Sequence, residues 1–210
     1  TQLTSGLFIW LLVLSPTYGY YEYFQLVLTW PASFCNSKKC FYRPIPTNFT
    51  IHGLWPDNWS KPLENCYPDA EIKGVEESQK IPELDKRWPQ LEHTRDYSLE
   101  YQPFWKNEYR KHGTCCNNKF NEAAYYDLAM SLKDRFDLLK ILSNNGITPG
   151  RSYIVQKVQD TIKTVTHSLP KLKCVEKPGL ELSEIVICFD EKGKYVVSCR
   201  HPGSCYKKGK

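Results

Sequence analysis

The sequence lacks the features that mark repeat, low-complexity or membrane-spanning proteins. Its 210 residues contain no internal repeat and no low-complexity tract, so a folded globular protein is expected. The longest apolar run, Leu7 to Leu14, is too short to span a bilayer. The net charge of +5 is a mild basic bias, which is compatible with a polyanionic partner but does not identify one. The length fits one domain with a hydrophobic core.

The first 19 residues, TQLTSGLFIWLLVLSPTYG, have the layout of a secretory signal peptide. The apolar stretch is followed by Ser15, Pro16 and small residues at Thr17 and Gly19. We predict cleavage after Gly19, which leaves a mature secreted domain at residues 20–210. The usual Met and basic start are missing, so we expect the signal to be truncated at its front. A buried N-terminal strand or helix is the weaker alternative.

Nine cysteines favour a secreted chain, because disulfides persist in oxidising compartments. Nine cysteines can form four disulfides and leave one free thiol, which is the simplest arrangement. The number of cysteines does not show which of them pair. IVICFD and YVVSC flank EKGK, and a two-residue turn at Gly193-Lys194 would place Cys188 opposite Cys199. A zinc site is the competing interpretation, but the sequence has no paired CxxC spacing.

Two other local patterns suit a secreted chain. Cys35 and Cys40 are close enough in sequence to close a short loop. Asn48 and Asn58 begin the sequons NFT and NWS, and we expect at least one to be glycosylated.

Hydrophobic periodicity predicts mixed strands and helices. Strands are expected at 20–30, at 49–56 before a turn, and in the C-terminal part. Residues 61–102 are expected to form exposed loops and short helices. Longer helices are expected at 103–112, 121–144 and 154–165. Asn145-Gly146 supplies a stop for the second of these helices. Because no βαβ regularity occurs, we predict an α+β fold. The expected architecture is a single domain with a central antiparallel sheet, packed by several helices and stabilised by disulfides.

Two segments carry candidate catalytic residues. In FWKNEYRKHGTCC, residues 104–116, a helix would bring Glu108, Lys111 and His112 together, although an exposed ion pair beside a histidine is the simpler alternative. In FTIHGLWPD, residues 49–57, His52 lies in an apolar run, where a lone histidine is more often a core residue. Two histidines among aromatics and glycines together form a candidate acid–base pair.

This residue set suits metal-free cleavage of RNA by the substrate's own 2′-OH. One histidine would remove the 2′-OH proton and the other would protonate the leaving 5′ oxygen. A lysine would stabilise the charge that builds on the phosphoryl oxygens. A nearby carboxylate must be protonated, or must orient Lys111 or His112. No metal or other cofactor is required, and DNA should survive.

FTIHGLWPD and FWKNEYRKHGTCC resemble the two active-site segments of the T2 family of secreted ribonucleases. QLVLTWPASFC, the NFT sequon that abuts IHGLWP, and the C-terminal cysteines extend the likeness over most of the mature chain. Together these features are similar to the self-incompatibility S-ribonucleases of nightshade-type plants.

The resemblance implies a role for each candidate. His112 would be the general base and His52 the general acid, while Glu108 and Lys111 would stabilise the pentacovalent phosphate. The product would be a 2′,3′-cyclic phosphate, later opened by water.

The resemblance also concerns residues outside this set. Trp55 and Phe104 would hold bases or wall the cleft. Asn107 stands where many relatives outside the self-incompatibility group have a third histidine, and Tyr97 where some have a cysteine, which leaves Cys116 unpaired. The implied disulfides are Cys35–Cys40, Cys66–Cys115, Cys174–Cys205 and Cys188–Cys199.

The resemblance further implies a biological role. The protein would be a monomeric extracellular enzyme of the style transmitting tissue that rejects self pollen and is recognised by pollen F-box (SCF-type) proteins. Residues 69–80 and 93–101 correspond to the variable regions and are expected to be exposed. A defence or phosphate-recycling ribonuclease, and a catalytically silent recognition glycoprotein, are the alternatives.

Overall fold

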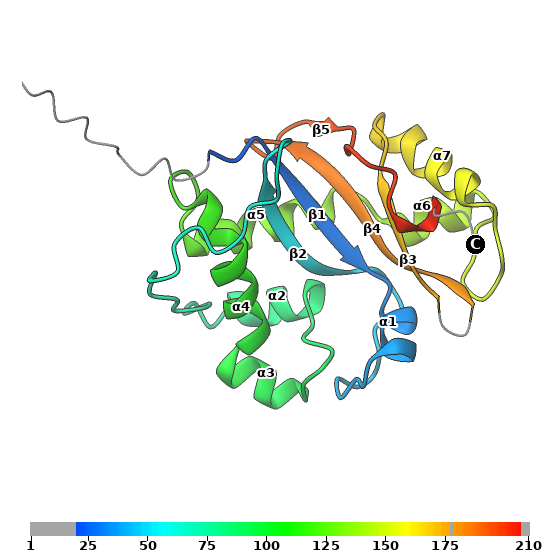
Figure 1. The fold of residues 1–210 in the computed structure, drawn as a ribbon. Helices are drawn as coiled ribbons and strands as arrows, with labels where there is room; N and C mark the ends of the chain where they lie inside the picture. The colour runs from blue at the N-terminus through cyan, green and yellow to red at the C-terminus, as the bar shows by residue number, and fades with distance from the viewer. Residues whose placement is uncertain (1–19, 177–178, 207–210) are drawn as a thin grey trace, which may run out of the picture.

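An antiparallel β-sheet forms the centre of the protein (Figure 1). The computed structural model describes residues 20–176 and 179–206, so the predicted signal peptide lies outside the described residues. The strands are β1 (Tyr23–Thr29), β2 (Thr50–Asp57), β3 (Lys171–Glu176), β4 (Leu180–Asp190) and β5 (Val196–Val197). Their order is β2-β1-β4-β3, and β5 pairs with β4. The predicted α+β class is therefore confirmed.

The described part of the chain contains seven α-helices, which pack at the edges of the sheet and on one of its faces. They are α1 (Pro31–Ser37), α2 (Lys80–Arg87), α3 (Arg95–Tyr101), α4 (Pro103–Lys111), α5 (Glu122–Asp134), α6 (Leu138–Asn144) and α7 (Val155–Thr166). Short 3-10 helices cover Gly113–Cys116 and Ser204–Tyr206. Helix α5 passes behind the sheet, and α2, α3 and α4 lie on the side of β2 (Figure 1). Among the described residues no helix is long and apolar enough to cross a bilayer.

The two faces of the sheet differ in how they are covered. On one face Leu26 and Ile187 are buried in the main core. Tyr125 of α5 belongs to that core and donates a hydrogen bond to the carbonyl of Leu54, which fixes the helix to β2. The opposite face has only a small apolar cluster that includes Val27. That second face therefore has room for polar side chains.

A β-bulge in β2 decides which residues reach the second face. Val27 pairs with Gly53 and the next residue, Leu28, pairs with Ile51, so His52 has no partner on β1. As a result Ile51 and Leu54 both point into the main core although they are three residues apart. His52 and Trp55 both lie on the other face for the same reason, and their rings are in contact.

The structure contains the four disulfides that the resemblance implied, Cys35–Cys40, Cys66–Cys115, Cys174–Cys205 and Cys188–Cys199. Cys116 is the free cysteine and is buried. Because eight cysteines are consumed in these bridges, the zinc interpretation of the cysteines is wrong.

The hairpin that joins β4 to β5 differs from the predicted one. The strands are connected by a longer loop over residues 191–195, and the amide of Asp190 donates to the carbonyl of Tyr195. Asp190 also accepts hydrogen bonds from the amides of Lys194 and Tyr195, which stabilises this wider loop. Cys188 consequently lies opposite Val197 rather than opposite Cys199.

The helix expected over 121–144 is two helices, α5 and α6. The helix is interrupted at residues 135–137. There the Asp137 side chain accepts a hydrogen bond from the amide of Lys140 and caps the start of α6. Arg135 meanwhile donates to the carbonyls of Gly193 and Lys194. The apolar spacing continues through the break, so periodicity alone could not reveal it. The predicted stop after 144 is confirmed.

Candidate active site

The second predicted segment forms helix α4 and the turn that follows it. Pro103 occupies the first turn of the helix, where a missing N–H costs nothing. His112 ends the helix, and its amide donates to the carbonyl of Glu108. Glu108 and His112 are both buried. Lys111 is partly exposed, and its ammonium pairs with Glu64 at 3.2 Å instead of contacting Glu108. Asn107 is exposed.

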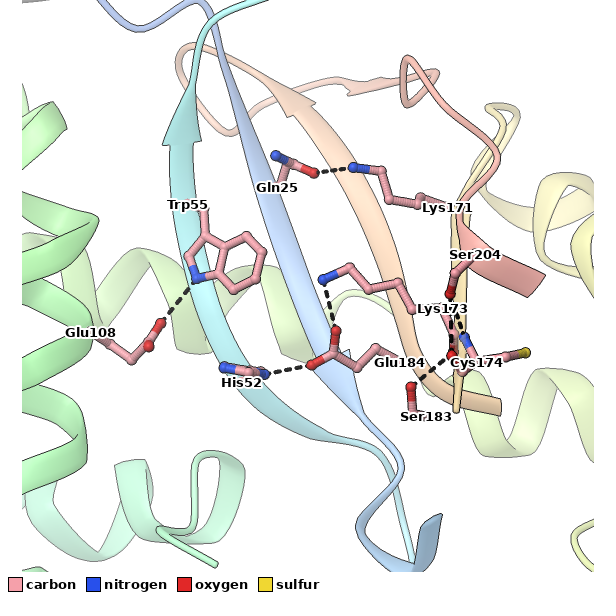
Figure 2. Close-up of polar contacts among 10 residues, drawn as sticks. All are labelled: Gln25, His52, Trp55, Glu108, Lys171, Lys173, Cys174, Ser183, Glu184 and Ser204. Carbon is pink, nitrogen blue, oxygen red and sulfur yellow. Dashed lines mark hydrogen bonds and ion pairs between the residues drawn. The ribbon is translucent and has the colours of Figure 1, made fainter. Parts of the chain in front are cut away.

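The indole of Trp55 brings the two predicted segments together. Its Nε1 donates to Glu108 Oε2 at 2.9 Å, as Figure 2 shows. One side of the ring stacks on His112, with centroids 4.8 Å apart and planes at 24°. His52 meets the same indole edge-on at 5.5 Å and lies 5.8 Å from the ring of Phe104. Five of the six predicted residues thus form one cluster, and Lys111 lies at its margin.

His112 lies in surroundings that favour its neutral form. The residue is 5% exposed, and its Nδ1 has no hydrogen-bond partner among the described residues. Burial lowers the pKa of His112 to about 3, and the positive charges of Lys111 and His52 act in the same direction. A neutral imidazole is the form that can accept a proton.

His52 lies in surroundings that favour its charged form. Its Nδ1 lies 2.5 Å from Glu184 Oε1, and Lys173 contacts the other oxygen of that carboxylate at 2.8 Å (Figure 2). Burial lowers the pKa of His52, but the hydrogen bond and charge of Glu184 and the charge of Glu108 outweigh it, so the pKa is raised. Burial likewise raises the pKa of Glu184, but the contacts with His52 and Lys173 lower it to about 2.

Glu108 is the third titratable group of the cluster. Burial raises its pKa, and the charge of His52 and the hydrogen bond from Trp55 offset this only in part. A carboxyl in this position sets the angle of the indole and is more easily protonated than an exposed one.

Sequence reasoning missed Glu184 and Lys173. Lys173 alternates with apolar residues in KLKCVE, which is typical of a strand with one solvated face, whereas Glu184 directly follows Ser183 in LELSEIVICFD and interrupts the alternation there. The only available signal was a charged residue next to the apolar run that begins at Ile185. That signal does not show which residue of a neighbouring strand Glu184 contacts.

A cavity lies beside His52. Its lining includes Thr50, His52, Gln90, Leu91 and Phe104. The side chain of Gln90 is held by hydrogen bonds to the carbonyl of Ser98 and from the amide of Phe104. The ring of Phe104 gives this cavity a flat aromatic wall, and that ring is in contact with the His52 ring. Among the described residues no group of three or more His, Cys, Asp and Glu side chains is arranged to hold a metal ion.

Comparison with known proteins places this site in a family. The sequence profile of the ribonuclease T2 family matches residues 21–199. The chain belongs to the ribonuclease T2 family and is an endoribonuclease.

Its relatives include several S-type ribonucleases. The chain is 51% identical over 211 residues to Ribonuclease S-7 of Nicotiana alata, covering 100% of this chain and 95% of that protein. It is 48% identical over 212 residues to Ribonuclease S-2 of Solanum tuberosum, covering 98% and 94%. The crystal structure of the self-incompatibility associated SF11-RNase of Nicotiana alata superposes with a TM-score of 0.82 at 47% identity, covering 88% of this chain and 93% of that one.

Gly53 is expected to be essential for the shape of the cluster. A Cβ atom there would collide with Glu108 Oε2 and Trp55 Nε1, the two atoms of the hydrogen bond that joins β2 to α4. We expect Gly53→Ala to lower the rate of RNA cleavage by about 10²-fold, because small displacements of positioned groups have effects of that size. Gly179→Ala is the matched control, since a Cβ there has no neighbour within 4 Å. Thermal unfolding verifies that both variants fold; full activity in Gly53→Ala would contradict the prediction.

Proposed function

We propose that this protein cleaves RNA by transphosphorylation, with His112 as general base and His52 as general acid. The observation that carries the proposal is that the two rings contact the same indole while their pKa values are shifted in opposite directions. His112 removes the proton of the 2′-OH, and the 2′ oxygen bonds to phosphorus. The bond to the 5′ oxygen breaks as His52 protonates that oxygen. Water then opens the 2′,3′-cyclic phosphate with the two roles reversed.

Lys111 and Glu108 complete the proposed chemistry. The side chains of Lys111 and Glu64 are both partly exposed, so their ion pair is weak. Lys111 can therefore move onto a substrate phosphate. The phosphate in turn would raise the pKa of His112 towards the working range of a base. Glu108, with its raised pKa, can donate to a phosphoryl oxygen or hold Trp55 in place. None of these roles requires a metal ion.

The first experiment is RNA digestion in the presence of a chelator. We expect His52→Asn and His112→Asn each to reduce cleavage by about 10²–10⁴-fold, the usual contribution of one general acid or base. His167→Asn is the control, because His167 is exposed at the end of α7. Chromatography of the wild-type products should reveal 2′,3′-cyclic phosphates. Substantial cleavage by both active-site variants would refute the assignment, and loss of wild-type activity in chelator would refute metal independence.

The pH dependence of kcat/KM follows from the two pKa shifts. Activity requires neutral His112 and protonated His52. The acid limb should therefore lie below the ordinary histidine value of about 6.5, and the alkaline limb above it. We expect His52→Asn to abolish the alkaline limb in its residual activity. A profile whose two limbs both lie below pH 6 would contradict a raised pKa for His52.

We also propose that Trp55 and Phe104 hold bases of the substrate or wall the cleft that receives them. Phe104 is partly exposed in the wall of the cavity beside His52, and Trp55 is partly exposed between the two histidines. Stacking on an aromatic side chain contributes about 1–3 kcal/mol per base. Phe104→Ala should therefore raise KM for a dinucleotide by about tenfold or more, whereas Phe41→Ala, at an exposed phenylalanine outside the cavity, should not. An unchanged KM in Phe104→Ala would remove that residue from the base site.

The biological role that we propose is rejection of self pollen by a secreted enzyme of the style. It is supported by the S-type ribonucleases among the relatives, by the description of SF11-RNase as self-incompatibility associated, and by the four disulfides. Cleavage of the signal after Gly19 and glycosylation at Asn48 or Asn58, both partly exposed, belong to the same proposal. N-terminal sequencing and glycosidase treatment of protein from styles test these two modifications.

Recognition by pollen F-box proteins would use residues 69–80 and 93–101. Most of these residues are exposed, and the Gln102 side chain joins the two stretches by hydrogen bonds to the amide and carbonyl of Val75, at 2.7 and 3.0 Å. They can therefore present one continuous surface. Transgenic styles expressing wild type or His112→Asn provide the test. Rejection by both forms would favour the silent glycoprotein, and rejection by neither would favour defence or phosphate recycling.

A further inference from the structure

Glu184 reaches His52 across an intervening strand. Thr29 of β1 is paired on one side with Thr50 of β2 and on the other with Glu184 of β4. The side chain of Thr29 is short, so it leaves space above β1 in which the Glu184 carboxylate and the His52 ring can meet. Figure 2 shows the two side chains pointing toward each other over β1. The side chain of Glu184 is 12% exposed and that of His52 is 29% exposed, so water has limited access to this contact.

The two carboxylate oxygens of Glu184 have different partners. Oε1 contacts His52 Nδ1 at 2.5 Å, and Oε2 contacts Lys173 Nζ at 2.8 Å. Lys173 lies directly opposite Glu184 in the β3–β4 ladder, and its ammonium also lies 4.7 Å from the centre of the Trp55 ring. The carboxylate is thus held from both ends and cannot rotate away from His52 without losing the lysine.

This contact decides which nitrogen of His52 can act on a substrate. An ionised carboxylate only accepts hydrogen bonds, so Nδ1 must carry a proton. The proton that the ring can transfer is then the one on Nε2. The titratable groups that influence His52 are Glu184 from β4, Lys173 from β3, and Glu108 and His112 from the α4 segment.

We propose that Glu184, braced by Lys173, is a positioning residue that presents the Nε2 proton of His52 to the leaving 5′ oxygen. This inference rests on the proposed role of His52 as general acid. As the 2′ oxygen bonds to phosphorus and the bond to the 5′ oxygen breaks, Nε2 gives its proton to that oxygen. His52 becomes neutral, and its Nδ1 proton stays on the ring, hydrogen-bonded to Glu184. Glu184 itself neither gains nor loses a proton.

Glu184→Gln tests the proposal, because it preserves the size of the side chain and removes the charge. Two substrates are compared: uridylyl-3′,5′-adenosine, whose alkoxide leaving group needs a proton, and uridine 3′-(4-nitrophenyl phosphate), whose leaving group does not. We expect kcat for the dinucleotide to fall by about 10–10²-fold, up to the lower end of the range for a lost general acid. The nitrophenyl ester should change by less than about threefold. Glu181→Gln is the control: Glu181 lies on the same strand, and its carboxylate accepts a hydrogen bond from Asn36, far from His52 in the ladder, so this variant should affect neither substrate.

The pH response supplies a second readout that a merely structural role would not move. We expect the pKa of the His52 ring, followed by NMR, to fall by about one unit or more when the neighbouring charge is removed. The alkaline limb of kcat/KM should fall by the same amount. Glu184→Asp retains the charge and should recover part of both losses. If Glu184→Gln does not fold, Glu184→Asp is expected to lie between wild type and His52→Ala on the dinucleotide while sparing the ester.

The outcomes separate this inference from the proposed function. If His52→Ala slows both substrates equally, the general-acid role of His52 is wrong and the role of Glu184 falls with it. If His52→Ala spares the nitrophenyl ester but Glu184→Gln slows both equally, or leaves the His52 pKa unchanged, the inference about Glu184 alone is overturned.

Discussion

The hydrogen bond from the indole of Trp55 to Glu108 is the contact on which the site depends. It joins strand β2 to helix α4 across 53 residues of sequence. The stacking of His112 on the same indole and the contact of His52 with Phe104 join the two elements at the same place. The Cys66–Cys115 disulfide and the hydrogen bond from the amide of Asn65 to the carbonyl of Lys111 hold the end of α4 from the other side. The helix is therefore fixed at both sides of His112.

Two identical side chains acquire opposite preferences because their neighbours differ. His112 is buried against an indole with positive charges nearby, so its charged form is disfavoured. His52 contacts a carboxylate that a lysine holds in place, so its charged form is favoured. Pairs of groups whose surroundings separate their pKa values in this way are typical of acid–base catalysis at one working pH. The division of labour is thus a property of the surroundings rather than of the residue type.

The sheet makes this arrangement possible by using its two faces differently. The helix-covered face supplies the main core, and the other face is left for Gln25, Trp55, Lys171 and Lys173 in Figure 2. The bulge at His52 changes the alternation of β2, so that His52 and Trp55 share this second face. A regular strand would have turned one of them into the core. The bulge in β2 thereby creates the contact between the His52 and Trp55 rings.

The sequence by itself determined the family, the mixed α+β class, the helix that carries Glu108 and His112, and the two segments from which the site is built. These features are local in sequence: motifs, periodicity and cysteine number depend on neighbouring residues. Only the tertiary structure decided that Glu184 and Lys173 meet His52, that Lys111 pairs with Glu64, and that the helix over 121–144 breaks at Asp137. Each of these depends on strand register, on a bulge, or on a cap that competes with a continuing helix. Contacts across strands are set by packing of the whole sheet, which no short stretch of sequence encodes.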